Sequence, residues 1–271
     1  TNTKAFELKS AIATNGAINI TSFGTVTVDE AKTLGLSDAN DLNITTYAGD
    51  IIVKNVTLGV AGDAKFDSSN VIDFTNAIVV ADELHMVVKN GISISSGQTN
   101  VNAISATTRL AGNISIAQNQ TKTLELKKIS VADGSLNVIT AGGLNVTDVS
   151  IVANEDSSDI TLNASGNITL GYLSAGKFIF DKNSMAKVTS FGDISITTTA
   201  GSISQTSKDS SVDLVADELI LSATAGINEI DIAEAKLGML ASKYAERLKL
   251  TEETSNNFSV SKQLSQYIVT A

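Results

Sequence analysis

The chain is dominated by short runs in which apolar and polar residues alternate. A period of two places Ile, Val or Leu on one face of a β-strand and Thr, Ser, Asn or Asp on the other. We therefore expect many short strands, each with one buried and one hydrated face. The clearest runs are residues 17–21, 25–28, 113–116, 159–162, 167–170, 193–196 and 211–214.

A glycine stands one or two positions before an isoleucine at many of these runs. These glycines are Gly16, Gly49, Gly91, Gly112, Gly166, Gly192, Gly201 and Gly226. Glycine adopts positive φ at little cost, so a glycine before each strand predicts a corner at which the chain turns repeatedly in the same sense. Recurrence at intervals of this scale is typical of a repeat protein.

Separate parts of the chain also match one another. Residues 81–86, 216–221 and 245–250 share one template, in which a small residue and two polar residues precede an alternating strand. Residues 26–36 resemble residues 230–239 apart from one extra position. These matches favour successive copies of one structural unit.

Stacked coils account for these patterns. If each coil contributes two or three strands and the next coil lies on top of it, identical positions form ladders around a narrow core of Ile, Val, Leu and Ala. Parallel neighbours about 4.8 Å apart then pair every strand's backbone groups. The chain contains no proline, which would remove one donor from such a ladder at each occurrence. We predict an all-β protein built as a parallel β-solenoid.

The expected organisation is a single elongated domain over residues 1–271, with the clearest repeats in 11–227 and C-terminal coils or a cap in 228–271. A β-sandwich also has regular short strands, but it rarely repeats a Gly-x-Ile corner. The apolar residues of 228–250 also fit a helical stripe, so a short helix capping the stack is an alternative there.

Three segments resemble the repeat region of filamentous-haemagglutinin-type exoproteins, which are giant bacterial adhesins. They are residues 165–180, 200–206 and 212–227, and the looser pattern covers most of residues 11–227. The resemblance implies a right-handed parallel β-helix that is secreted or displayed on the cell surface.

Composition excludes several classes of protein. The chain has no cysteine, so disulfide scaffolds and thiolate zinc sites cannot form. Its formal net charge of -10 argues against nucleic-acid binding, which needs a basic face. No apolar run is long enough for a membrane-spanning helix.

Candidate chemistry is sparse. His85 is the one histidine, and we expect it at an outward position between Leu84 and Met86. Carboxylates that could serve a hydrolase or lyase lie beside predicted turns: Asp38 with Asp41, Glu155 and Asp156 with Asp159, Asp217 with Glu218, and Glu252 with Glu253. Within this set Asp38, Asp41, Asp156 and Asp159 offer the oxygen ligands that calcium prefers. We predict no catalytic residues and no cofactor other than calcium.

The predicted function is structural and adhesive rather than enzymatic. We expect the shaft or repeating subunit of an extracellular fibre on a bacterial surface or in a biofilm matrix. Unpaired strand edges at the ends of a solenoid invite another chain. The expected partners are therefore a second copy stacked head to tail, or further coils of the same chain, with glycans or matrix polysaccharide along the sides. The alternatives are a carbohydrate-active enzyme and a receptor-binding module on the same scaffold.

Overall fold

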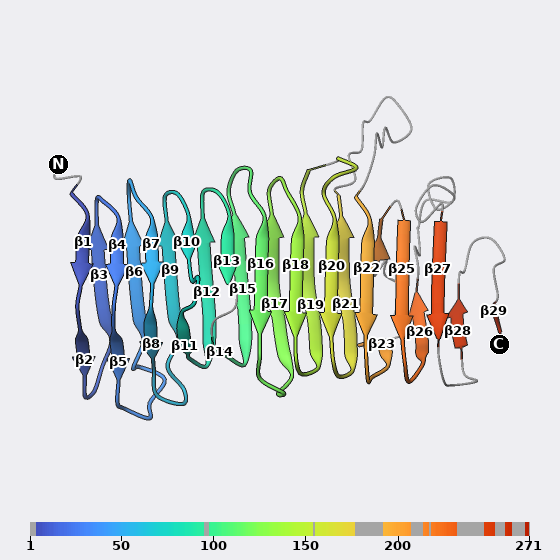
Figure 1. Cartoon of the computed structure of the whole chain (residues 1–271), viewed down its shortest axis with the longest axis horizontal. Helices are drawn as coiled ribbons and strands as arrows, with labels where there is room; N and C mark the ends of the chain where they lie inside the picture. Colours follow the sequence, from blue (N-terminus) through green and yellow to red (C-terminus); the bar gives the residue numbers. More distant parts are fainter. Residues whose placement is uncertain are drawn as a thin grey trace.

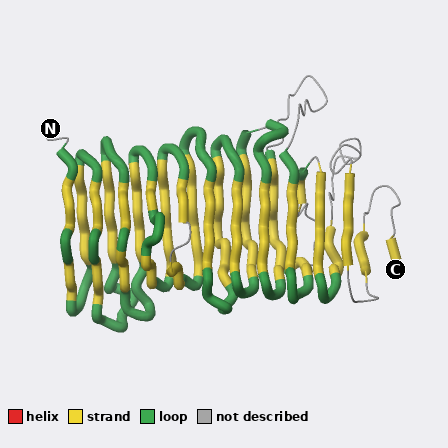
Figure 2. The backbone as a smooth tube through the Cα atoms, in the orientation of Figure 1, coloured by secondary structure: helices red, strands yellow, loops and turns green. Residues whose placement is uncertain are grey.

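The structure is a parallel β-solenoid, as the alternation predicts (Figure 1). The computed structural model describes residues 4–94, 98–153, 155–176, 192–206, 214–216, 218–231, 247–252, 258–261 and 269–270. Strands stack side by side along one long axis, with the N-terminal coils at one end and the C-terminal coils at the other (Figure 1). Within the described residues the ordered elements are strands joined by turns, without a helix (Figure 2).

The strands of the described residues form three sheets, which we call A, B and C. Sheet A has 11 strands: β1 (Phe6–Leu8), β4 (Val26–Val28), β7 (Ile51–Val53), β10 (Ile72–Asp73), β13 (Ile92–Ile94), β16 (Ile114–Gln118), β18 (Leu136–Thr140), β20 (Ile160–Ala164), β22 (Ile194–Thr198), β25 (Glu218–Ala223) and β27 (Arg247–Glu252). Sheet B has five: β2 (Ala11–Ala13), β5 (Ala31–Thr33), β8 (Asn55–Thr57), β11 (Ile78–Val80) and β14 (Gln98–Asn100).

Sheet C runs along the whole stack. It contains β3 (Ile18–Ser22), β6 (Leu42–Thr46), β9 (Ala64–Ser68), β12 (Glu83–Val88), β15 (Ala103–Thr108), β17 (Leu124–Val131), β19 (Leu144–Ile151), β21 (Ile168–Ala175), β23 (Ile203–Gln205), β26 (Ile227–Asp231), β28 (Phe258–Ser261) and β29 (Val269–Thr270), with β24 (Leu214–Val215) beside β21. The coils pair in parallel, whereas β29 pairs antiparallel with β28.

The cross-section of the solenoid changes along its axis. The first coils follow the order C, A, B and are three-sided, whereas the described strands after β14 belong to sheets A and C only. There the sheet C strands β17, β19 and β21 lengthen to 8 residues each. The expectation of two or three strands per coil is thus met in both forms.

The core is a set of apolar ladders that run parallel to the solenoid axis. One row of sheet A places a buried Val, Ile or Leu at the same position of successive coils, with an exposed fraction of 2% or less at each. Its members are Val26, Ile51, Ile72, Ile92, Ile114, Leu136, Ile160, Ile194 and Leu219. In the three-sided part, Phe66 and Phe74 pack edge to face in the interior, with ring centroids 5.3 Å apart.

The glycine corners have two different physical causes. Gly16, Gly112 and Gly226 have positive φ, as predicted. The other predicted corners do not have positive φ. There the coils stack so closely that an added Cβ would lie 3.0 Å or less from the neighbouring coil, at Gly49, Gly91, Gly166, Gly192 and Gly201. At Gly201 an added Cβ would lie 2.4 Å from the carbonyl carbon of Gly166 in the coil below. Positive φ therefore accounts for some of the predicted glycine corners, and close stacking accounts for the others.

Residues 228–250, for which the sequence allowed either a helix or strands, are described only at their two ends. β26 and β27 are strands that cover residues 227–231 and 247–252. The intervening residues 232–246, on which the helical alternative depends, lie outside the described residues.

Candidate functional site

The one histidine of the chain lies on the outer face of sheet C, as the sequence predicts. Leu84 and Met86 point inward and are 0% and 1% exposed, so Glu83 and His85 face outward on the same side of β12. The register aligns Leu84 with Ala64 of β9. Glu83 therefore lies next to Asp63, the residue that precedes β9 in the coil below.

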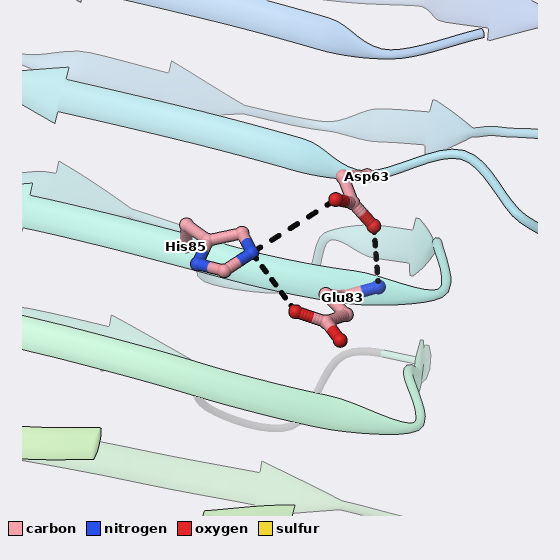
Figure 3. A group of neighbouring side chains, drawn as sticks. All are labelled: Asp63, Glu83 and His85. Carbon is pink, nitrogen blue, oxygen red and sulfur yellow. Dashed lines mark hydrogen bonds and ion pairs between the residues drawn. The ribbon is translucent and has the colours of Figure 1, made fainter. Parts of the chain in front are cut away.

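These three side chains converge on one another (Figure 3). The His85 Nε2 atom lies 3.1 Å from Glu83 Oε2 and 4.0 Å from Asp63 Oδ2. One potential ligand atom from each residue lies within 4.8 Å of the other two. The side chains of Asp63, Glu83 and His85 are 17%, 23% and 33% exposed, so solvent ions reach them. We call this group the imidazole–carboxylate trio.

Neighbouring groups hold the two carboxylates of the trio in place. The backbone N–H of Glu83 donates a hydrogen bond of 3.3 Å to Asp63 Oδ1. Lys127 forms an ion pair with Glu83 Oε1. Glu83 thus pairs with Lys127 through Oε1 and Asp63 accepts the Glu83 N–H through Oδ1, while the second oxygen of each carboxylate faces the imidazole.

Lys127 reaches Glu83 because of a β-bulge. Where β15 pairs with β17, Ile104 aligns with Leu126 but Ser105 aligns with Lys128, so Lys127 is an extra residue. A bulge re-aims the side chain that it displaces. Ala103 is the β15 residue directly above Glu83 and has only a methyl side chain, which leaves the path from Lys127 open.

A second lysine approaches the trio from β9. Lys65 Nζ lies 3.6 Å from Asp63 Oδ2 and 3.4 Å from Asp41 Oδ2. Burial raises the pKa of Asp63, an effect that Lys65 opposes and that the nearby carboxylates of Asp41 and Glu83 reinforce. The hydrogen bond to Glu83 raises the pKa of Lys127. The two carboxylates of the trio are thus paired with two lysines, Lys65 and Lys127.

Of the four calcium candidates Asp41 lies beside the trio, and Asp41 and Asp159 have a role in stacking. Asp41 Oδ1 accepts the backbone N–H of Asp63 at 3.1 Å. Asp159 Oδ1 accepts that of Asp193 at 2.9 Å. Asp38 and Asp156 are exposed residues of turns. Calcium binding by these four residues stays a prediction.

The remaining carboxylate candidates are only partly described. Glu155 is exposed near the turn that holds Asp156. Asp217 and Glu253 lie outside the described residues, as do the side chains of Glu218 and Glu252. Among the described carboxylates, those that gather with the histidine are Asp63 and Glu83, which our sequence analysis did not single out. The available signal was the outward direction of Glu83 and His85, but the coil length that brings Asp63 beside them is not visible in a short motif.

Comparison of the chain with known protein families, with curated proteins and with solved structures gave no match. The described residues contain no helix that is long and apolar enough to cross a membrane.

Proposed function

We propose that this chain is a rigid segment of an extracellular adhesive fibre, a shaft or repeating subunit that associates end to end. The observation that carries the proposal is that the first described coil has an unpaired side, onto which a second copy or further coils of the same chain would stack. Within the described residues β1, β2 and β3 each pair with a strand on one side only. A row of unpaired backbone groups is a template for another strand.

The interior of the first coil is open as well. Phe6 aligns with Val26 of the next coil, yet Phe6 is 44% exposed and Val26 is 0% exposed. Ile20 aligns with Ile44 and is only half-buried, whereas Ile44 is 1% exposed. A further coil placed on this end would bury the same apolar rows that are fully covered one coil deeper, and burial of apolar surface is the main favourable term in association.

The sides of the fibre suit attachment to uncharged polymers. Along sheet A, the outward residues of β16, β18, β20 and β22 are hydroxyl, amide or aliphatic residues without a charge: Ser115, Ala117, Asn137, Ile139, Thr161, Asn163, Ser195 and Thr197. Such a face presents hydrogen-bonding groups at the repeat of the ladder, about 4.8 Å. We place the contact with glycans or matrix polysaccharide there.

Sizing chromatography and electron microscopy of the purified chain at increasing concentration test end-to-end association. We expect the unmodified chain to form filaments of solenoid width. Ile20→Lys places a charge on the open apolar end and abolishes them, whereas Ile139→Lys makes the same change on the side of sheet A and leaves them intact. Monodisperse monomers without filaments at every concentration would contradict the proposal.

A second variant distinguishes loss of the end-to-end contact from local unfolding of the first coil. The Ile18 N–H donates to Asp41 O, so alternation along β3 directs the backbone groups of Thr21 towards the open side. Thr21→Pro therefore blocks the edge but keeps the pairing of β3 with β6, and proline is tolerated on edge strands. Loss of filaments with an unchanged circular dichroism spectrum would locate the contact at this edge.

A further inference from the structure

The imidazole–carboxylate trio has the arrangement of a metal site. Its three donors come from two successive coils, His85 and Glu83 from β12 and Asp63 from the end of the turn before β9. Glu83 Oε2 and Asp63 Oδ2 both point towards His85 Nε2, and Asp63 Oδ2 also lies 3.6 Å from Lys65 Nζ (Figure 3).

The outer contacts of the carboxylates are those that metal ligands commonly have. Hydrogen bonds and charges in the shell around a metal site fix the orientation of its ligands. Here the Glu83 N–H holds Asp63 through Oδ1, and Lys127 holds Glu83 through Oε1. The ligand atoms are therefore positioned before any ion arrives, which lowers the entropy cost of binding.

We propose that Asp63, Glu83 and His85 bind one divalent cation of borderline softness, of which Zn²⁺ is the type, with water completing the coordination. Imidazole nitrogen suits Zn²⁺, Cu²⁺ and Ni²⁺, while Ca²⁺ and Mg²⁺ select oxygen-only ligands. Three protein ligands with an open fourth position are a known form of zinc coordination. The site is independent of fibre formation, because it lies on the outer side of sheet C and not at the open end.

Lys65 is the competitor of the cation. Its ammonium group lies 3.6 Å from Asp63 Oδ2, the oxygen that the cation needs. It also lies 3.4 Å from Asp41 Oδ2, so it can move onto Asp41 when the cation enters. Removal of Lys65 should therefore strengthen binding, and loss of the His85 imidazole is the change that tells coordination from a patch that merely attracts cations.

A bound cation would clamp two coils together. Each coil of a solenoid packs only against its immediate neighbours. A ligand that binds the folded state but not the unfolded one stabilises it by mass action. Zn²⁺ should thus raise the melting temperature of the protein, and the effect should vanish when the trio is broken.

Isothermal titration calorimetry with Zn²⁺, in a buffer that does not bind metal, tests the site on the complete chain. We expect saturable binding at one ion per chain, at least tenfold weaker in His85→Ala and several-fold tighter in Lys65→Met. Asp148→Asn is the matched control, because Asp148 lies on β19 of the same sheet, three strands from β12, and its loss leaves binding unchanged. Ca²⁺ in place of Zn²⁺ should bind at least tenfold more weakly.

The melting temperature measured with and without Zn²⁺ provides a second readout for variants that fold less well. A shift in the unmodified chain that His85→Ala loses supports the site. Absence of saturable binding, or binding that His85→Ala leaves intact, would overturn it.

Discussion

The residues directly before the sheet A strands form a polar ladder along the corners of successive coils. Thr25, Asp50, Asn113, Ser135 and Asp159 each precede the first buried residue of a sheet A strand, and the side-chain oxygen of each accepts the backbone N–H of the equivalent residue one coil further on. The distances range from 2.9 to 3.3 Å. This explains why Asp, Asn, Ser or Thr stands between the glycine and the isoleucine in so many corners.

Substitution of Asp159 tests whether this ladder stabilises the fold. Its Oδ1 atom accepts the N–H of Asp193 at 2.9 Å across a part-buried corner. Asp159→Ala leaves that donor without a partner, which should cost about 1–2 kcal/mol in the free energy of unfolding. Asp159→Asn keeps an acceptor of the same shape and should stay within about 0.5 kcal/mol of the unmodified chain. Chemical denaturation of the three proteins measures the difference, and equal losses in both variants would argue against the hydrogen bond.

Close stacking makes Gly201 harder to replace than Gly16. An added Cβ at Gly201 meets the backbone of Gly166 at 2.4 Å, whereas at Gly16, with φ of +89°, nothing lies within 4 Å. Gly16→Ala should cost about 1 kcal/mol in backbone strain. Gly201→Ala must push two coils apart and should cost about 3 kcal/mol. Thermal or urea unfolding ranks the two, and a larger loss at Gly16 would refute the argument from stacking.

At the scale of the strand, inward and outward positions of the same residue type should behave differently. Ile114 of β16 is 0% exposed within the sheet A ladder, while Ile139 of β18 faces outward and is 50% exposed. Ile114→Ala removes buried methyl groups from a packed core and should cost about 3 kcal/mol. Ile139→Ala should change stability by no more than about 0.5 kcal/mol. Urea unfolding of both variants checks the inside-outside assignment, which fails if the two costs are alike.

The sequence predicts strands well but not the sheet to which each strand belongs. Gly192 and Gly201 both precede an isoleucine and are nine residues apart, because Ile194 begins a strand of sheet A and Ile203 follows in sheet C of the same coil. The corner motif is therefore shared by two sides of the coil. Its spacing is irregular because a local pattern does not encode which side comes next.

The internal sequence matches likewise do not identify the sheet to which a strand belongs. Residues 216–221 and 245–250 match in sequence, and β25 and β27 pair in the predicted register, with Leu219 beside Leu248. Residues 81–86 carry the same template but lead into β12 of sheet C. The candidate site has this limit as well. His85 could be placed outward from its neighbours, but its approach to Asp63 depends on the length of the intervening coil.

For the whole molecule, the net charge opposes end-to-end association, whereas burial of the open apolar end favours it. The chain carries a formal net charge of -10, so identical copies repel one another at low ionic strength. Raising the salt concentration from about 0.1 M to about 1 M shortens the screening length from about 10 Å to about 3 Å. End-to-end association buries apolar residues and backbone edges, which salt does not weaken in this way. Filament growth should therefore accelerate as salt is added.

Light scattering after a salt jump, with electron microscopy of the product, measures this response. Ile20→Lys should stay monomeric at every salt concentration although it lowers the net negative charge, because it places an ammonium group on the apolar end. Ile139→Lys makes the same change in charge on the side of sheet A and should follow the unmodified chain or assemble slightly faster. Slower growth at high salt would mean that attraction between charges, and not burial of the open coil, holds the copies together.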